Sequence, residues 1–185
     1  MENQVHDFEH IYRIYFSKMK RFAKEYVLSE DDAENLVQDV FVELWEKRSH
    51  FMNRVNLIAF LFTSVKNRAI NLLRRRVIEQ KATNQLQEEY MITIQMHLDS
   101  LEALDQNIFS EQDIDELISS AIDSLPEKCR EIFILSKIEG KKQKEVAEIL
   151  NISVNTVETQ IGIAYKKLKT KLKKFTPIYI FLTFF

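Results

Sequence analysis

Glycine and proline are almost missing from this chain, which contains two of each among 185 residues. These two residue types most often end helices and form tight turns. Their scarcity predicts long, unbroken helices and argues against strand-rich folds. It also argues against a glycine-rich phosphate-binding loop. We therefore expect an all-α protein, and two small helical domains suit a chain of this length better than one.

The charged residues are strongly segregated, although the formal net charge is only −2. Eleven acidic residues and no Lys or Arg lie between Ala82 and Glu127. Ten Lys against four Glu lie from Lys137 to Lys174, and six basic residues against one Glu lie from Leu57 to Lys81. Two basic blocks around an acidic middle are typical of two nucleic-acid-binding surfaces joined by a linker.

These shifts in composition predict the domain organisation. We place one helical domain at 1–81, an acidic and partly helical linker at 82–112, a second helical domain at 113–175 and an apolar tail at 176–185. The tail is far shorter than the roughly 20 apolar residues that a membrane span needs. Two alternatives stay open for it, a hydrophobic extension docked on the protein or an exposed adhesive end.

Hydrophobic periodicity divides the first domain into helices. An apolar stripe predicts a helix over about 5–27, and Ser29 with Asp32 three residues later resembles a capping box that opens a helix to about Lys47. A loop is expected at 50–56, followed by a long helix over 57–81 that is apolar at its start and basic at its end.

The second domain ends in a helix-turn-helix pattern. Pro126 suits the first position of a helix and Gly140 its C-terminal stop. A short helix then covers 143–150, a turn follows at 151–152, and Ser153 is a good N-cap for a second helix. That helix has one buried stripe, formed by Val157, Ile161, Ala164 and Leu168. Short polar residues on its first turns and lysines after them are suited to base edges and to phosphates.

Three segments resemble one family. Residues 32–45 (DAENLVQDVFVELW) resemble the core-binding helix of bacterial RNA polymerase sigma factors of the extracytoplasmic-function group. Residues 67–76 (NRAINLLRRR) resemble the end of that family's promoter-melting helix, and residues 125–133 with the helix-turn-helix resemble its fourth region, a winged-helix-like domain. The likeness covers most of the chain and follows the family's order.

The resemblance implies three binding surfaces. One exposed helix face would bind the β′ clamp of core RNA polymerase: Asn35, Gln38, Asp39, Val42 and Glu46. A second surface would capture and help melt the −10 promoter element: Phe60, Lys66, Asn67, Arg68, Asn71, Arg74, Arg75 and Arg76. A third would read the −35 element: Ser153, Asn155, Glu158, Thr159, Lys166 and Lys167. For Phe60, a place in the hydrophobic core is an equally open alternative.

The resemblance also implies partners and a compartment. The second domain would bind the polymerase β flap, and an anti-sigma factor would bury the same surfaces. No cofactor, metal, small-molecule substrate or catalytic residue is expected. A single cysteine, Cys129, favours a reducing compartment, and no secretory leader is recognisable, so we expect a cytoplasmic protein.

Two other classes of protein are weighed against a sigma factor. A helix-turn-helix regulator would bind duplex DNA without polymerase, but its second domain would bind a ligand or form a dimer, whereas the first half here carries a second basic helix. His6, Glu9 and His10 match the H-x-x-E-H zinc pattern. A zinc enzyme also needs a third protein ligand, and neither His50 nor His97 has acids at motif spacing.

Overall fold

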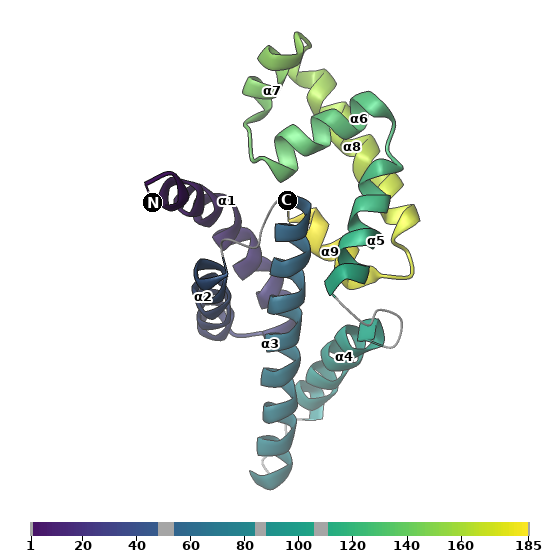
Figure 1. The fold of residues 1–185 in the computed structure, drawn as a ribbon. Coiled ribbons are helices and arrows are strands. Elements are labelled where there is room, and N and C mark those ends of the chain that lie inside the picture. Colours follow the sequence, from purple (N-terminus) through teal and green to yellow (C-terminus); the bar gives the residue numbers. More distant parts are fainter. Residues whose placement is uncertain (1, 48–53, 84–87, 106–110, 185) are drawn as a thin grey trace.

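The computed structural model describes residues 2–47, 54–83, 88–105 and 111–184. Within these ranges all regular structure is helical, which confirms the expected all-α class (Figure 1). The elements are α1 (Glu2–Val27), α2 (Glu30–Glu46), α3 (Arg54–Thr83), α4 (Glu88–Asp105), α5 (Glu111–Asp123), α6 (Glu127–Phe133), the π-helical turn η2 (Ile134–Ile138), α7 (Gln143–Leu150), α8 (Val154–Lys171) and α9 (Thr176–Thr183). The loop predicted at 50–56 falls mostly outside the described residues, and α3 begins within it.

Helices α1, α2 and α3 form the first body. Ser29 caps α2 as predicted, since its side chain accepts a hydrogen bond from the backbone N–H of Asp32 at 3.3 Å. The apolar side chains on one face of α2 are all buried: Ala33, Leu36, Val37, Val40, Phe41 and Leu44. Phe41 on that face contacts the rings of Phe8, Tyr12 and Phe16 on α1. Capping and a single apolar stripe therefore set both the start of α2 and the face that it turns to α1.

Most of the predicted linker forms a regular helix. Helix α4 packs along α3 (Figure 1), and it buries Ile94, Leu98 and Leu101, which are spaced four and three residues apart. His97 on the same helix donates from Nδ1 to the carbonyl oxygen of Tyr26, at 2.8 Å. The acidic segment is thus partly helical as expected, and it is attached to the first body instead of lying free of it.

Helices α5 to α8 form the second body, and α5 also packs along α3 of the first body. Pro126 is the N-cap of α6, one position before the predicted one. Gly140 ends the following turn with φ +72°, and a Cβ there would lie 2.9 Å from a methyl group of Ile14 on α1. The left-handed conformation and the close approach both require glycine at this position. Its place as a helix stop is confirmed, and it lies against the first body.

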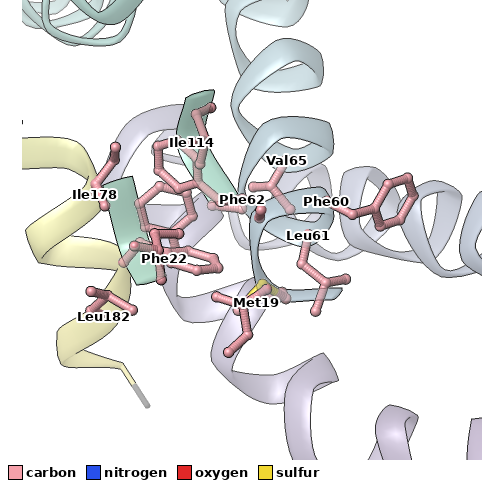
Figure 2. Packing of buried hydrophobic residues seen from close by; sticks show 14 of the residues in the cluster. Met19, Phe22, Phe60, Leu61, Phe62, Val65, Ile114, Ile178 and Leu182 are labelled. Carbon is pink, nitrogen blue, oxygen red and sulfur yellow. The ribbon is translucent and has the colours of Figure 1, made fainter. Parts of the chain in front are cut away.

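The apolar tail forms α9, which packs against α1 and α8 (Figure 1). Pro177, Ile178, Phe181 and Leu182 are all buried. Figure 2 shows Ile178 and Leu182 facing Phe22 of α1 and Phe62 of α3, within one hydrophobic core that extends through both bodies. Of the two alternatives for the tail, the docked extension is the observed one. In the described part of the chain, no helix combines the length and the apolar character needed to cross a bilayer.

Candidate nucleic-acid interface

One face of α2 is open to solvent along its whole length. Its five residues are those predicted for the polymerase: Asn35, Gln38, Asp39, Val42 and Glu46, and all five are exposed. Val42 is 59% exposed, so an apolar side chain lies within this polar face. The structure thus brings the predicted set together on one surface.

An apolar groove of about 410 Å³ borders this face. Gln38 and Val42 line it from α2 together with the rings of Phe8, Tyr12, Phe41 and Trp45. Trp45 lies edge-on to Phe8, with the ring centroids 4.9 Å apart. The apolar stripe of α1 predicts core positions for Phe8 and Tyr12, so their place in this groove was not predicted from the sequence.

A second groove, of about 530 Å³, runs between α2 and α3. It is lined by two residues of the predicted polymerase face, three of the predicted −10 set and three others: Asn35, Asp39, Arg68, Asn71, Arg75, Asp32, Leu36 and Leu72. The two predicted surfaces are therefore continuous across this groove, although the sequence analysis treated them as separate.

The arginines of α3 are held by carboxylates of other helices. Arg68 donates to Glu43 of α2 at 2.7 Å, and Arg74 donates to Glu102 of α4 at 2.7 Å. Arg76 bonds Asp32 and also donates to the carbonyl oxygen of Val27 at 2.7 Å. These contacts are charge-assisted and connect different helices, so the three arginines stabilise the fold as well as carrying positive charge.

Arg75, Asn67 and Asn71 differ from those three arginines. All three are exposed on α3. Arg75 pairs with Glu79 one turn away at 3.5 Å, and both side chains are more than half exposed. An exposed i, i+4 pair of this kind adds at most a few tenths of a kcal/mol, about 0.3–0.5. Arg75 is therefore the arginine of this set that a phosphate group can engage at least cost.

Phe60 and Lys66 of the predicted −10 set lie inside the first body. Phe60 is 3% exposed and Lys66 is 5% exposed. Figure 2 shows Phe60 on the side of α3 away from Ile178 and Leu182, and the ammonium group of Lys47 lies 5.7 Å from the centroid of its ring. The core alternative for Phe60 is the one observed. In this arrangement neither side chain is accessible to a DNA strand.

Glu43 is a charged residue of this surface that the sequence analysis did not single out. Burial raises its pKa, but hydrogen bonds from Lys47 and Arg68 outweigh burial and hold the pKa below its ordinary value. Both cations lie close, with Lys47 Nζ at 2.6 Å and Arg68 at 2.7 Å from the carboxylate oxygens. The carboxylate stays ionised and holds Arg68, which lines the groove between α2 and α3.

The helix-turn-helix has the predicted bounds. Helix α7 covers Gln143–Leu150, Asn151 adopts the left-handed conformation with φ 51°, and Ser153 caps α8 by accepting from the backbone N–H of Thr156 at 3.1 Å. The predicted apolar stripe of α8 is buried in all four positions. Val146 and Ala147 of α7 are buried, whereas Ile149 is 57% exposed.

The predicted −35 residues lie on the outer surface of α8. Ser153, Asn155, Glu158 and Thr159 are exposed at its N-terminal end, and Lys166 and Lys167 are exposed further along. Thr159 donates its hydroxyl to the carbonyl oxygen of Asn155 at 2.8 Å. The structure brings the polar set together on one helix end. The lysines lie about two turns further along α8, where phosphates are the expected ligands.

The two lysines line a groove with Ser124, Thr170 and Lys171 at the junction of α5 and α8.

No group of three or more His, Cys, Asp or Glu side chains that could hold a metal ion occurs in the described part of the chain. The side chain of His6, from the zinc pattern, lies outside the described residues. Apart from Val42, the exposed side chains of the predicted surfaces are cations, carboxylates, amides and hydroxyls.

Comparisons with known proteins match both bodies to one family. The sequence profile of sigma-70 region 2 matches residues 11–77, and that of sigma-70 region 4 matches residues 115–168. The first match covers most of α1, all of α2 and most of α3, and the second runs from within α5 to within α8.

Individual relatives are distant but cover most of the chain. The ferric citrate uptake sigma factor FecI of Escherichia coli K12 is 25% identical over 157 residues, which is 85% of this chain and 86% of that protein. The RNA polymerase sigma factor SigV of Bacillus subtilis 168 is 28% identical over 154 residues, 83% of this chain and 84% of that protein. A solved structure of the sigma factor RpoE with the anti-sigma factor NepR from Bartonella quintana aligns over 90% of this chain and 97% of that chain, with 22% identity and a TM-score of 0.38.

Proposed function

The chain belongs to the sigma-70 family of RNA polymerase sigma factors, in the extracytoplasmic-function group, and from this membership we propose how its surfaces divide the work of initiation. As a sigma factor it binds core RNA polymerase and directs promoter-specific transcription. Sigma factors are non-catalytic DNA-binding initiation factors. We propose that this chain likewise has no catalytic residues and needs no cofactor or small-molecule substrate.

The exposed face of α2 is proposed to bind the polymerase β′ clamp. Its acids and amides, Asn35, Gln38, Asp39 and Glu46, suit a basic partner helix, and Val42 supplies an apolar contact at the centre. Charge complementarity across such an interface sets orientation and association rate more than affinity. The adjoining groove with Trp45 and Tyr12 adds apolar area, which supports binding of a helix along this face.

Helix α3 is proposed to engage the −10 element. Arg75, Asn67 and Asn71 are exposed, and they lie at or beside the groove that continues from the α2 face. Opening a duplex costs about 1.4 kcal/mol per base-pair step. Holding the exposed strand on cations and amides offsets that cost. Arg68, Arg74 and Arg76 contribute positive charge while they also bridge helices.

The N-terminal end of α8 is proposed to read the −35 element in the major groove. Ser153, Asn155, Glu158 and Thr159 are short or medium polar side chains on one helix end, and Glu158 can accept from a cytosine amine. Lys166 and Lys167 are proposed to contact phosphates. Relatives often carry basic residues at the places of Gln160 and Ile163, so phosphate contacts here depend more on the flanking lysines.

Two further partners follow from the family. The second body is proposed to bind the polymerase β flap, and an anti-sigma factor is proposed to hold the protein inactive by covering these surfaces. The protein is proposed to act in the cytoplasm, where bacterial RNA polymerase transcribes. The alternative of a polymerase-independent regulator is disfavoured by the region 2 match over residues 11–77.

The observation that carries the proposal is the joint match of regions 2 and 4, in the family's order, on a chain whose α2 face is exposed. Run-off transcription with purified core polymerase on genomic fragments tests it. Asp39→Arg should lower the affinity for core polymerase, whereas Glu25→Arg, the same change at an exposed site on α1, should not. A gel shift that gives tight, specific duplex binding unaffected by polymerase would contradict the proposal.

A further inference from the structure

Helix α9 joins the two DNA-binding bodies, and it lies outside both family matches. It begins at Thr176, after the region 4 match ends at 168, and it continues the chain directly from the recognition helix α8. Its buried side inserts into the first body. The ring of Phe181 lies edge-on to Phe22 of α1 at 5.1 Å and to Phe62 of α3 at 5.0 Å between centroids.

This contact is extensive for so short a helix. Phe181, Ile178 and Leu182 have no exposed area, and the cationic group of Arg21 on α1 lies 5.9 Å from the ring centroid of Phe184. Edge-to-face aromatic pairs add about 0.5–1.5 kcal/mol each beyond the burial of their area. The end of α8 is thus anchored in the core of the body that carries the α2 and α3 surfaces (Figure 2).

Two further contacts hold the bodies together away from α9: α5 packs along α3, and a seam joins α1 to the turn after α6. The Tyr15 hydroxyl of α1 donates to the carbonyl oxygen of Ile138, Lys18 donates to that of Lys137 at 3.4 Å, and Gly140 lies against Ile14. All of these polar contacts reach backbone atoms of the second body. With α9 docked, the relative position of the −10 and −35 surfaces is fixed.

That fixed arrangement conflicts with promoter geometry. Elements centred near −35 and −10 lie about 25 base pairs apart, about 85 Å along B-form DNA at about 3.4 Å per base pair. A compact chain of this length has a radius of gyration of about 16 Å. The two surfaces must therefore move apart before both elements are bound.

We propose that α9 is a latch, an autoinhibitory contact that holds the second body on the first and is released when core polymerase separates them. The proposal rests on the proposed function. The second body has a small core of its own that does not include α9, formed by Ile132, Val146, Ala147, Val157 and Ile161. The −35 residues stay exposed in the latched state, so the latch blocks simultaneous use of both elements and leaves duplex binding by α8 unaffected.

Phe181→Asp tests the latch in the full-length protein, because a carboxylate cannot be buried between Phe22 and Phe62 without a partner. Thr176→Asp is the matched control, since the same carboxylate is added to α9 at an exposed position. We expect Phe181→Asp to increase the radius of gyration in small-angle X-ray scattering. It should also lower, by about fivefold, the concentration of this protein that gives half-maximal run-off transcription. The reason is that a closed fraction no longer reduces the apparent affinity for core polymerase. The control should change neither quantity.

Three results would overturn the latch. One is an unchanged radius of gyration in Phe181→Asp. Another is a Phe181→Asp protein that has a larger radius of gyration but needs the wild-type concentration for half-maximal transcription. The third is loss of helical circular dichroism and polymerase binding, which would make α9 an ordinary part of the core. Amide hydrogen exchange on the wild-type chain supplies a second measurement, and residues 178–182 should lose protection when core polymerase is added. If the wild-type protein does not bind core polymerase but Phe181→Asp still opens, the proposed function fails and the intramolecular contact stands.

Discussion

Glu102 of α4 accepts a hydrogen bond from Arg74 of α3 at 2.7 Å, so a carboxylate of the predicted linker covers a cation of the proposed −10 surface. Arg74 is 55% exposed and Glu102 33% exposed, and the pair is therefore open to competition from a phosphate group. The acidic segment between the two basic blocks partly neutralises one of them within the folded chain. A DNA phosphate that binds Arg74 therefore competes with Glu102 for the N–H groups of its guanidinium.

We expect Glu102→Gln to strengthen binding of a single-stranded −10 oligonucleotide. An exposed ion pair contributes about 0.2–1 kcal/mol, so the gain should not exceed about fivefold. Fluorescence anisotropy at low salt measures it in the presence of core polymerase. Glu89→Gln makes the same charge change at an exposed site on the same helix and should give a smaller effect. Equal gains from both variants would mean that net charge alone is responsible.

Arg75→Ala and Arg76→Ala should separate DNA binding from stability. Arg75 is exposed, so its loss should weaken open-complex formation with little effect on unfolding or on core binding. Arg76 bonds Asp32 and the Val27 carbonyl at the corner between α1 and α2, so its loss should lower the free energy of unfolding by about 1.5–3 kcal/mol. Urea unfolding and permanganate footprinting measure the two effects. Wild-type stability of Arg76→Ala would contradict the bridging role.

Lys18 should make stability increase with pH above neutrality. Burial, with a smaller contribution from the charge of Lys137, lowers its pKa from 10.5 to about 8. Between these values the unfolded chain binds a proton that the folded chain does not, so the free energy of unfolding rises with pH from about 8. Burial raises the pKa of Tyr26, and it raises that of Tyr165 to about 12, so stability should fall again above about pH 10.

Urea unfolding at pH 7.5, 8.5 and 9.5 checks this dependence. Lys18→Met keeps the length of the side chain and removes the charge, so the rise should become smaller. The free energy of unfolding should still rise weakly with pH in that variant, because burial also lowers the pKa of Lys137. Lys128→Met, at an exposed site on α6, is the control and should follow the wild-type curve. A rise of the same size in Lys18→Met would exclude Lys18 as its source.

Leu28→Gly should stabilise the turn between α1 and α2. Leu28 has φ 64°, and the left-handed region costs a branched side chain about 1–2 kcal/mol. Glycine removes that strain but loses about 0.5–1 kcal/mol of chain entropy, so the net gain should be about 0.5–1 kcal/mol. Asn151→Gly, at φ 51°, should gain less, since asparagine tolerates this conformation. Chemical denaturation compares the two.

Glu158→Gln should change which −35 sequences are used. A carboxylate can only accept, whereas an amide also donates, so the preference for cytosine at the contacted position should relax. Selection of −35 sequences in run-off transcription measures it, with Glu127→Gln on α6 as an exposed control. An unaltered preference would remove Glu158 from the reading set.

Local features of this chain were predictable because their causes lie within one or two helical turns. The cap at Ser29, the turn at Asn151 and the buried stripe of α8 depend on neighbours three or four residues away. The division into regions 2 and 4 was likewise visible in short motifs, and the family comparisons confirm it. The proposed contact residues and the domain boundaries at 81, 112 and 175 stay predictions.

Helix α4 shows where periodicity was insufficient. Ile94, Leu98 and Leu101 form a narrow buried stripe, but Ile92 and Met96 lie exposed on another side, at 60% and 65%. Apolar residues on two sides weaken the contrast that marks an amphipathic helix. Which of the two sides is buried depended on the surface that α3 presents, and that surface is remote in sequence.

Residue spacing within single segments was enough to predict α1, α2, α3, the helix-turn-helix, the caps at Ser29 and Ser153, and the exposed faces of α2 and α8. Only the tertiary structure decided that Phe60 and Lys66 are buried, that Arg68, Arg74 and Arg76 bridge helices, and that the apolar tail enters the first body. Those outcomes depend on which faces of distant segments meet. Burial and charge pairing between remote residues are properties of the packed chain, so no local pattern encodes them.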